Sequence, residues 1–192
     1  MQHLSKQFDQ ELDDIRSQLL AMCALACSQL ERVHRALDTG AIFSVEEIAA
    51  TEREINKAHV DIDALCAMII VKRQPAADDL RHVLASMHAI NDVERIGDET
   101  KRTLARLAAS PAISPSTRSE LAAMSAMVIR MLQAAMESLS RLLVVQAYDV
   151  IRADSRLDTQ YATVMERLES ITPQSQAEVR ALLDSASIAK AL

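Results

Sequence analysis

Aromatic residues, glycine and proline are all scarce in this sequence. Among its 192 residues there is no Trp, and there are only two Tyr, two Phe, two Gly and four Pro. Nine Met and abundant Ala and Leu stand in their place. Because Gly and Pro are the poorest helix formers and Ala, Leu and Met are among the best, this composition predicts an all-helical fold.

The chain also lacks an excess of positive charge, a long apolar run and an even number of cysteines. A net charge of −6 argues against a nucleic-acid-binding protein, which normally carries a basic face. The longest apolar run, residues 19–27, is too short to cross a bilayer, and residues 2–14 are too charged for a signal peptide. The odd cysteine count indicates a reducing cytosol. We therefore expect a soluble, cytoplasmic protein without membrane insertion, which can still lie at the inner membrane through protein partners.

Apolar residues recur at steps of three and four along most of the sequence, which predicts long amphipathic helices. The first is expected over residues 4–37. Ser44 and Glu47 form a capping-box pattern that starts a second helix, which runs to about Arg73. A third helix is expected to begin at Pro75 and to end near Ala109, before a Pro- and Ser-rich linker over residues 110–116.

A shift of 102 residues superimposes the second half of the sequence on the first without a gap. It pairs Glu52 with Asp154 and Asn56 with Asp158, so an acidic position recurs at the same spacing. Such self-similarity indicates an internal duplication. We predict two tandem three-helix bundles of long antiparallel helices, over residues 1–110 and 116–192. The sixth helix is short, because Leu192 corresponds to Ile90.

A cluster of polar residues over residues 91–98 falls within the third predicted helix. Glu94 and Asp98 stand one helical turn apart, with Asn91 one turn earlier, so all three share a face. On a helix they continue an apolar stripe formed by Leu80, Leu84 and Met87, so polar residues occupy positions where the pattern predicts core. Gly97 stands among them, although Gly costs about 1 kcal/mol against Ala in a helix, and permits a close approach to the backbone. The cluster is either a solvated acidic turn or half of a metal site with hard oxygen ligands.

Residues 73–81 and 91–98 resemble two segments of the PhoU family of bacterial phosphate-signalling regulators. The first carries Arg-Gln-Pro followed by Asp-Leu-Arg, and the second carries Asp-x-Glu-Arg-Ile-Gly-Asp. The resemblance covers essentially the whole chain. The motif residues for which we expect a structural role are Arg73, Gln74, Pro75, Asp79, Arg81, Arg95 and Gly97.

This resemblance implies a negative regulator of phosphate uptake and phosphate-starvation signalling, with a sensor histidine kinase and the ATPase of the phosphate ABC transporter as partners. Family members are tandem three-helix bundles, and some bind iron or zinc, in part as multinuclear clusters, at paired carboxylates. The corresponding candidates for metal ligands are Glu94, Asp98, Glu52, Asn91, Asn56, Asp154 and Asp158.

Three departures from the family pattern predict a weaker or smaller metal site. Asn56 stands where the second helix-two carboxylate is expected. Arg102 stands where the family often has Asn, and it places a positive charge by the cluster. The second copy ends before its own version of the acidic segment.

No nucleophile–base constellation and no glycine-rich phosphate loop is found, so we expect an adaptor and not an enzyme. One alternative is a di-iron carboxylate oxidase, with Glu31/His34 and Asp79/His82 as its Glu-x-x-His-like pairs. The other is a purely structural, metal-free bundle in which the acids are solvated. A homodimer is also expected, because the short sixth helix leaves apolar residues such as Met127, Met131 and Leu132 uncovered.

Overall fold

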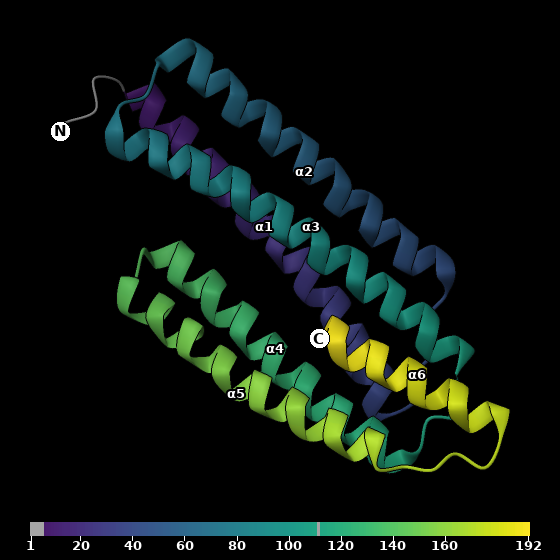
Figure 1. The fold of residues 1–192 in the computed structure, drawn as a ribbon. Coiled ribbons are helices and arrows are strands. Elements are labelled where there is room, and N and C mark those ends of the chain that lie inside the picture. The colour runs from purple at the N-terminus through teal and green to yellow at the C-terminus, as the bar shows by residue number, and fades with distance from the viewer. Residues whose placement is uncertain (1–5, 111) are drawn as a thin grey trace.

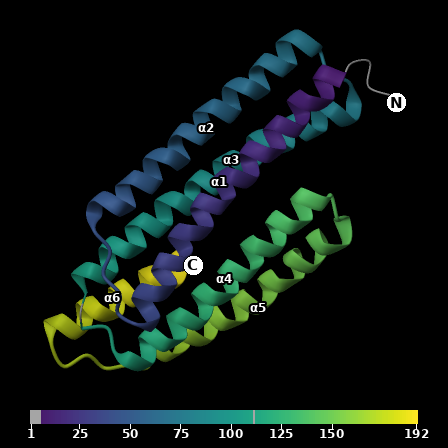
Figure 2. The ribbon, with the colours of Figure 1, turned by 180° about the vertical axis from the view of Figure 1, so that it is seen from behind.

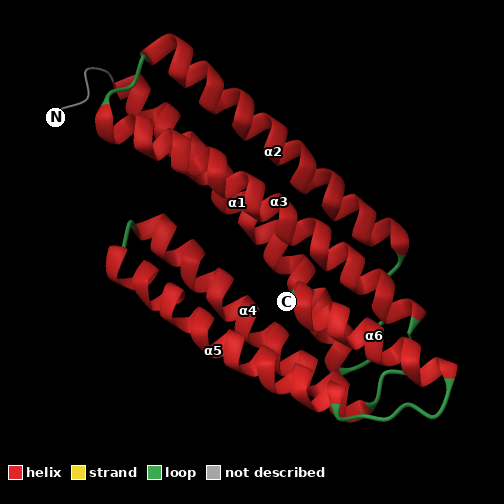
Figure 3. Ribbon diagram, viewed as in Figure 1, coloured by secondary structure: helices red, strands yellow, loops and turns green. Residues whose placement is uncertain are grey.

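A computed structural model of the chain describes residues 6–110 and 112–192 and consists of helices joined by short loops (Figures 1 and 3). The helices are α1 (Lys6–Asp38), α2 (Val45–Arg73), α3 (Ala77–Ala109), α4 (Pro115–Arg141), α5 (Val144–Glu169) and α6 (Gln176–Ala191). No strand occurs in these residues. The all-α prediction, with five long helices and a short sixth, is confirmed.

The first three helices pack against one another along their full lengths, and the last three form a second, smaller group (Figures 1 and 2). Helix α1 also packs along α4, and α6 lies against α3, α4 and α5. Because α6 has 16 residues, it covers only one end of the α4–α5 hairpin, and the opposite end projects beyond it (Figure 1). No helix in the described part of the chain is long and apolar enough to span a membrane.

Local capping signals set most helix boundaries. Ser44 accepts a hydrogen bond from the Glu47 backbone N–H, and the Glu47 carboxylate accepts one from the Ser44 N–H, so the predicted capping box is present. Ser114, directly before Pro115, caps α4 through its hydroxyl oxygen, which accepts a hydrogen bond from the Thr117 N–H. Each cap satisfies backbone donors that the first helical turn leaves unpaired.

The start of α3 differs from the prediction by two residues, since Pro75 precedes the helix instead of beginning it. Gln74 adopts a left-handed conformation (φ 47°) and donates its N–H to the Ile70 carbonyl, which closes α2. The chain then needs an extended residue, Ala76, before the next helix can begin at Ala77. Proline's missing N–H is therefore accommodated in the turn between the helices.

Two main apolar cores hold the helices together. One lies within α1–α3 and includes Leu19, Met22, Ile62 and Ile90. The other joins the two helix groups, since its residues come from α1, α3, α4, α5 and α6; they are Val33, Ala36, Leu37, Leu104, Leu107, Ile113, Leu121, Ala122, Met124, Val164, Leu168, Ala181, Ile188 and Ala189. The second core therefore joins the two helix groups to each other.

The most buried stripe of α3 runs beside the one that the sequence indicated, of which Met87 is half-buried and packs at the edge of the core. The residues that face the core are Val83, Ile90, Val93, Gly97, Thr100, Thr103, Leu104 and Leu107. Leu84, which was placed in the stripe, is 43% exposed. The acidic residues thus lie beside the core stripe and do not interrupt it, because the β-branched and small residues one position away pack against α1 and α2.

Arg73, one of the family-motif residues, ties the end of α2 to the start of α1. Its Nε and Nη2 donate to the two carboxylate oxygens of Glu11 over 2.8 and 2.7 Å. This two-pronged geometry is the strong form of an arginine–carboxylate pair. The hydrogen bonds from Arg73 hold the pKa of Glu11 below its ordinary value.

Because of this pairing, the free energy of unfolding should fall as the pH is lowered. A carboxylate whose pKa is lowered by folding contributes stability above its unfolded pKa and loses that contribution as the pH falls through the folded pKa. We therefore expect Glu11→Gln to lower the urea midpoint at pH 7, and to reduce the further fall in the midpoint between pH 7 and about pH 3. Asp61→Asn, which removes an exposed partner of Lys57, is the control. Equal pH dependence in wild type and Glu11→Gln would contradict the assignment.

Candidate functional site

The family-motif glycine lies at a close contact between α3 and α2. A Cβ built on Gly97 would stand 3.1 Å from Ile55 Cδ1 and 3.4 Å from its Cγ2, so the Ile55 side chain occupies the space that any larger residue needs. Ile55 itself is 1% exposed. The glycine in the sequence predicted a close approach to the backbone, and the group that approaches is the Ile55 side chain of the neighbouring helix α2.

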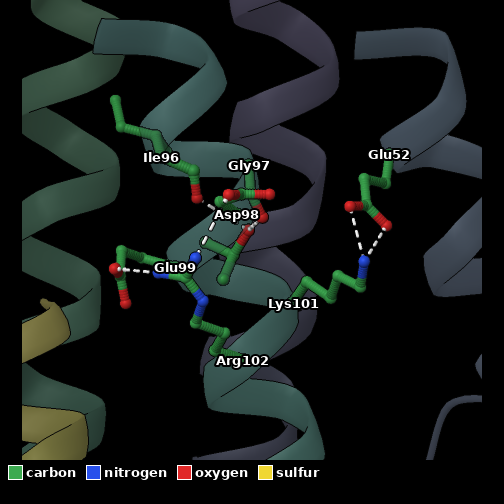
Figure 4. A network of polar contacts seen from close by, with 8 residues as sticks. Glu52, Ile96, Gly97, Asp98, Glu99, Lys101 and Arg102 are labelled. Atoms are coloured by element: carbon green, nitrogen blue, oxygen red, sulfur yellow. Dashed lines mark hydrogen bonds and ion pairs between the residues drawn. The ribbon is translucent and has the colours of Figure 1, made fainter. Parts of the chain in front are cut away.

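Glu52, the helix-two candidate ligand, is bound by a lysine. Lys101 Nζ lies 2.5 Å from both Glu52 carboxylate oxygens (Figure 4). The Glu52 side chain is only 14% exposed, whereas that of Lys101 is 46% exposed. Lys101 lies on α3 about one turn beyond Asp98, and its side chain reaches across to α2. Its ammonium group therefore neutralises the charge of Glu52.

Asp98 is paired along its own helix. Arg102 Nη2 lies 3.3 Å from Asp98 Oδ2, and Arg102 Nη1 donates to Glu99 Oε1 over 2.6 Å. Figure 4 shows Arg102 directed toward these two carboxylates, on the side of α3 away from Lys101. The positive charge that the sequence placed by the cluster is confirmed.

The remaining predicted ligands are scattered over the surface. Asn91 Oδ1 lies 3.0 Å from His59 Nε2, and Asn91 Nδ2 donates to the Met87 carbonyl over 2.8 Å. Glu94 is half-buried on α3. Asn56 on α2, and Asp154 and Asp158 on α5, are exposed.

These residues do not converge on one point. Ile55 lies against Gly97 and His59 against Asn91, so Glu94 is level with the residues between Ile55 and His59. Along the α2 axis, the level of Glu94 is therefore about six residues from Glu52, which is roughly 9 Å at an axial rise of 1.5 Å per residue. In residues 6–110 and 112–192, no three His, Cys, Asp or Glu side chains are close enough to hold a metal ion. The arrangement as it stands does not fit iron or zinc, and the metal site stays a prediction.

The two Glu-x-x-His-like pairs lie at opposite ends of the first bundle. His34 Nδ1 is 3.0 Å from Ser125 Oγ and 3.2 Å from the Ala122 carbonyl, so His34 joins α1 to α4. His82 instead borders a small cavity beside Asp9, near the start of α1. From Asp9 to His34 the axial rise amounts to roughly 38 Å, at 1.5 Å per residue. A di-iron site needs both pairs together, so the oxidase alternative has no site here.

The other motif residues serve the ends and the surface of the helices. Gln74 and Pro75 form the α2–α3 turn, and Arg81 pairs with Asp78 in the first turns of α3. Asp79 is half-buried and Arg95 is exposed. Sequence reasoning missed the two partners that matter most, Glu11 for Arg73 and Lys101 for Glu52. Both pairs join different helices, and no spacing along the chain reveals them.

Comparison with known proteins gives a consistent result across both bundles. The family model described as "PhoU domain" matches residues 19–106 and 121–192, one segment in each helix group. Among solved structures, the chain is similar to the crystal structure of PhoU from Pseudomonas aeruginosa, with a TM-score of 0.89 and 28% identity, covering 96% of this chain and 89% of that one. A second structure, the regulatory protein PhoU of the phosphate transport system from Streptococcus pneumoniae, shares the fold with a TM-score of 0.78 and 19% identity; 96% of this chain and 90% of that one are covered.

Curated relatives agree with the structural neighbours. A phosphate-specific transport system accessory protein PhoU homolog from Pseudomonas aeruginosa is 34% identical, over 86% of this chain and 69% of the relative. The protein of the same description from a Burkholderia species is 32% identical, over 99% and 83%. The phosphate-specific transport system accessory protein PhoU of Escherichia coli K12 is 26% identical, over 99% and 79%.

Proposed function

This chain belongs to the PhoU family, and on that premise we propose that it is a regulatory adaptor that restrains phosphate uptake and phosphate-starvation signalling. The observation that carries the proposal is the match to phosphate transport accessory proteins over both helix groups. The architecture is compatible with such a role, since long helices present wide faces to partners.

A cavity of about 840 Å³ lies beside the α1–α2 loop and the end of α3, and its lining is mainly Ala, Leu and Ile. Its charged members are Asp38, Lys101 and Arg118. That the protein is an adaptor without catalysis stays a prediction.

The partners that we propose are a sensor histidine kinase and the ATPase of the phosphate transporter, which the protein would meet in the cytoplasm or at the inner membrane.

A homodimer also stays a prediction. Met127, Met131 and Leu132 are half-buried, and the stronger exposure is at the tip of the α4–α5 hairpin. There the exposed apolar residues are Leu142, Leu143, Val144, Val145, Tyr148 and Ile151. Exposed apolar patches of this kind commonly mark protein contacts.

Deletion of the gene tests the proposal. We expect the deletion strain to express alkaline phosphatase and the high-affinity phosphate transporter severalfold above wild type in phosphate-rich medium, because the restraint on starvation signalling is lost. The measurement is enzyme activity together with transcript level, in phosphate-rich and phosphate-poor cultures.

A plasmid copy of the gene should restore repression, which excludes an effect on neighbouring genes. A further deletion of the sensor kinase gene should abolish the derepression, since the kinase is the proposed route of the signal. Unchanged phosphatase expression in phosphate-rich medium would contradict the regulatory role.

A further inference from the structure

The acidic residues of the α2–α3 contact already have cationic partners within the chain. Lys101 binds both oxygens of Glu52, and Arg102 binds Asp98 together with Glu99 (Figure 4). We infer that Lys101 and Arg102 serve as built-in counter-ions at this face, so that it binds neither iron nor zinc. This inference is independent of the proposed regulatory function.

Burial makes the Lys101 pair effective. The Glu52 side chain is 14% exposed, so its charge is poorly screened by solvent and needs a nearby partner. The ammonium group supplies that partner at 2.5 Å from both oxygens. A metal ion would have to displace Nζ from both oxygens and then remain beside the tethered positive charge, which repels it.

Arg102 has the same effect on the α3 carboxylates. It lies 3.3 Å from Asp98 and 2.6 Å from Glu99, so one guanidinium group faces both carboxylates. Of the three predicted carboxylates on α2 and α3, Glu52 and Asp98 therefore have basic partners, and Glu94 alone forms no ion pair in the described part of the chain. One carboxylate is far short of the four ligands of a structural zinc site.

The carboxylates at this contact are therefore neutralised by basic side chains of the same protein, and no metal ion is needed to balance their charge. Lys101 and Arg102 are the residues that determine whether the face accepts a cation. Removing both positive charges should leave the Glu52 and Asp98 carboxylates without their counter-ions, so that a divalent ion is attracted to this face instead of being repelled.

Metal binding by variants of the full-length, untagged protein tests this inference. Wild type, Lys101→Met with Arg102→Met, and a control with Lys57→Met and Arg81→Met are dialysed against Zn²⁺, or against Fe²⁺ without oxygen, and bound metal is measured by mass spectrometry. The control removes one exposed cation from α2 and one from α3, each paired with a nearby carboxylate of its own helix. Circular dichroism checks that each variant is folded.

We expect wild type and the control to retain far less than one metal ion per chain. The Lys101/Arg102 variant should bind at least about tenfold more tightly, because two repelling charges are gone. The added substitution Glu52→Gln should remove the gained binding. Of the three proteins, only the Lys101/Arg102 variant should show a higher melting temperature when metal is added, since the ion binds only the folded state.

Two results would overturn the inference. One is stoichiometric metal in wild type that is lost in Glu94→Gln with Asp98→Asn, since the carboxylates would then bind a cation despite Lys101 and Arg102. The other is a folded Lys101/Arg102 variant that binds no more tightly than the control. If that variant does not fold, the single substitution Lys101→Met is measured in its place. The first result, which needs only wild type and the Glu94→Gln, Asp98→Asn variant, still tests the inference.

Discussion

Replacing Leu121 by Ala should lower the free energy of unfolding by about 3 kcal/mol, within the range measured for large-to-small core substitutions. Leu121 lies on α4, is 0% exposed and belongs to the core that joins both helix groups. In a chain of this size, such a loss corresponds to a melting temperature lower by roughly 6–12 °C. Urea unfolding followed by circular dichroism measures the change.

The more informative result concerns where the stability is lost. Because Val33, Leu37 and Leu104 of the first group pack in the same core as Leu121 and Met124, we expect both groups to unfold in one transition. Hydrogen exchange should therefore show a similar loss of protection for slowly exchanging amides around Ile62 in α2 and around Val164 in α5.

A matched control is available on α6. Leu183 is 65% exposed, so Leu183→Ala should change the free energy of unfolding by no more than about 0.5 kcal/mol. If Leu121→Ala reduces protection in α4–α6 alone, then the two groups are separate units, and the shared core does not couple them.

Local signals explain why the helices could be predicted so closely. The capping pair Ser44 and Glu47, and the Pro115 that follows Ser114, act within a few residues, so the sequence contains the whole interaction. The 102-residue repeat supplied the number of helices and the short sixth one. Fold class and helix boundaries depend mainly on such short-range chemistry.

Interactions between helices could not be predicted in the same way. On α3, Leu80, Leu84 and Met87 form one apolar stripe, while Val83, Ile90 and Val93 form another that overlaps it. Only packing against α1 and α2 decides that the second is buried. The same holds for the acidic residues, because the helix register places Lys101, and not Glu94, opposite Glu52. Spacing along one helix indicates which residues share a face, but not what they meet.

Gly97→Leu should be as damaging as the loss of Leu121, by the opposite physical effect. A Cβ at this position already stands 3.1 Å from Ile55 Cδ1, so a leucine side chain has no space between α2 and α3. Overpacking of a close-packed contact typically costs about 1–3 kcal/mol, and we expect the upper end because Ile55 is 1% exposed and cannot turn away into solvent.

Gly97→Ala should have a much smaller effect. Alanine gains about 1 kcal/mol in helix propensity over glycine, which offsets the cost of moving Ile55 by a few tenths of an ångström. Ala85→Leu, at an exposed position of the same helix, is the control for the added leucine and should be nearly neutral. Denaturant unfolding of the three variants measures the differences.

A double-mutant cycle with Ile55→Ala identifies the cause of the damage. Ile55→Ala alone should cost about 2–5 kcal/mol by leaving a cavity beside Gly97. Leucine at position 97 can fill part of that cavity, so the double variant should be more stable than the two separate losses predict, by about 1–3 kcal/mol. Additive losses would show that Ile55 is not what excludes a side chain at Gly97. Because Lys101 reaches Glu52 one turn further along the same contact, Gly97→Leu should also separate that ion pair, and Gly97→Leu with Ile55→Ala should restore it.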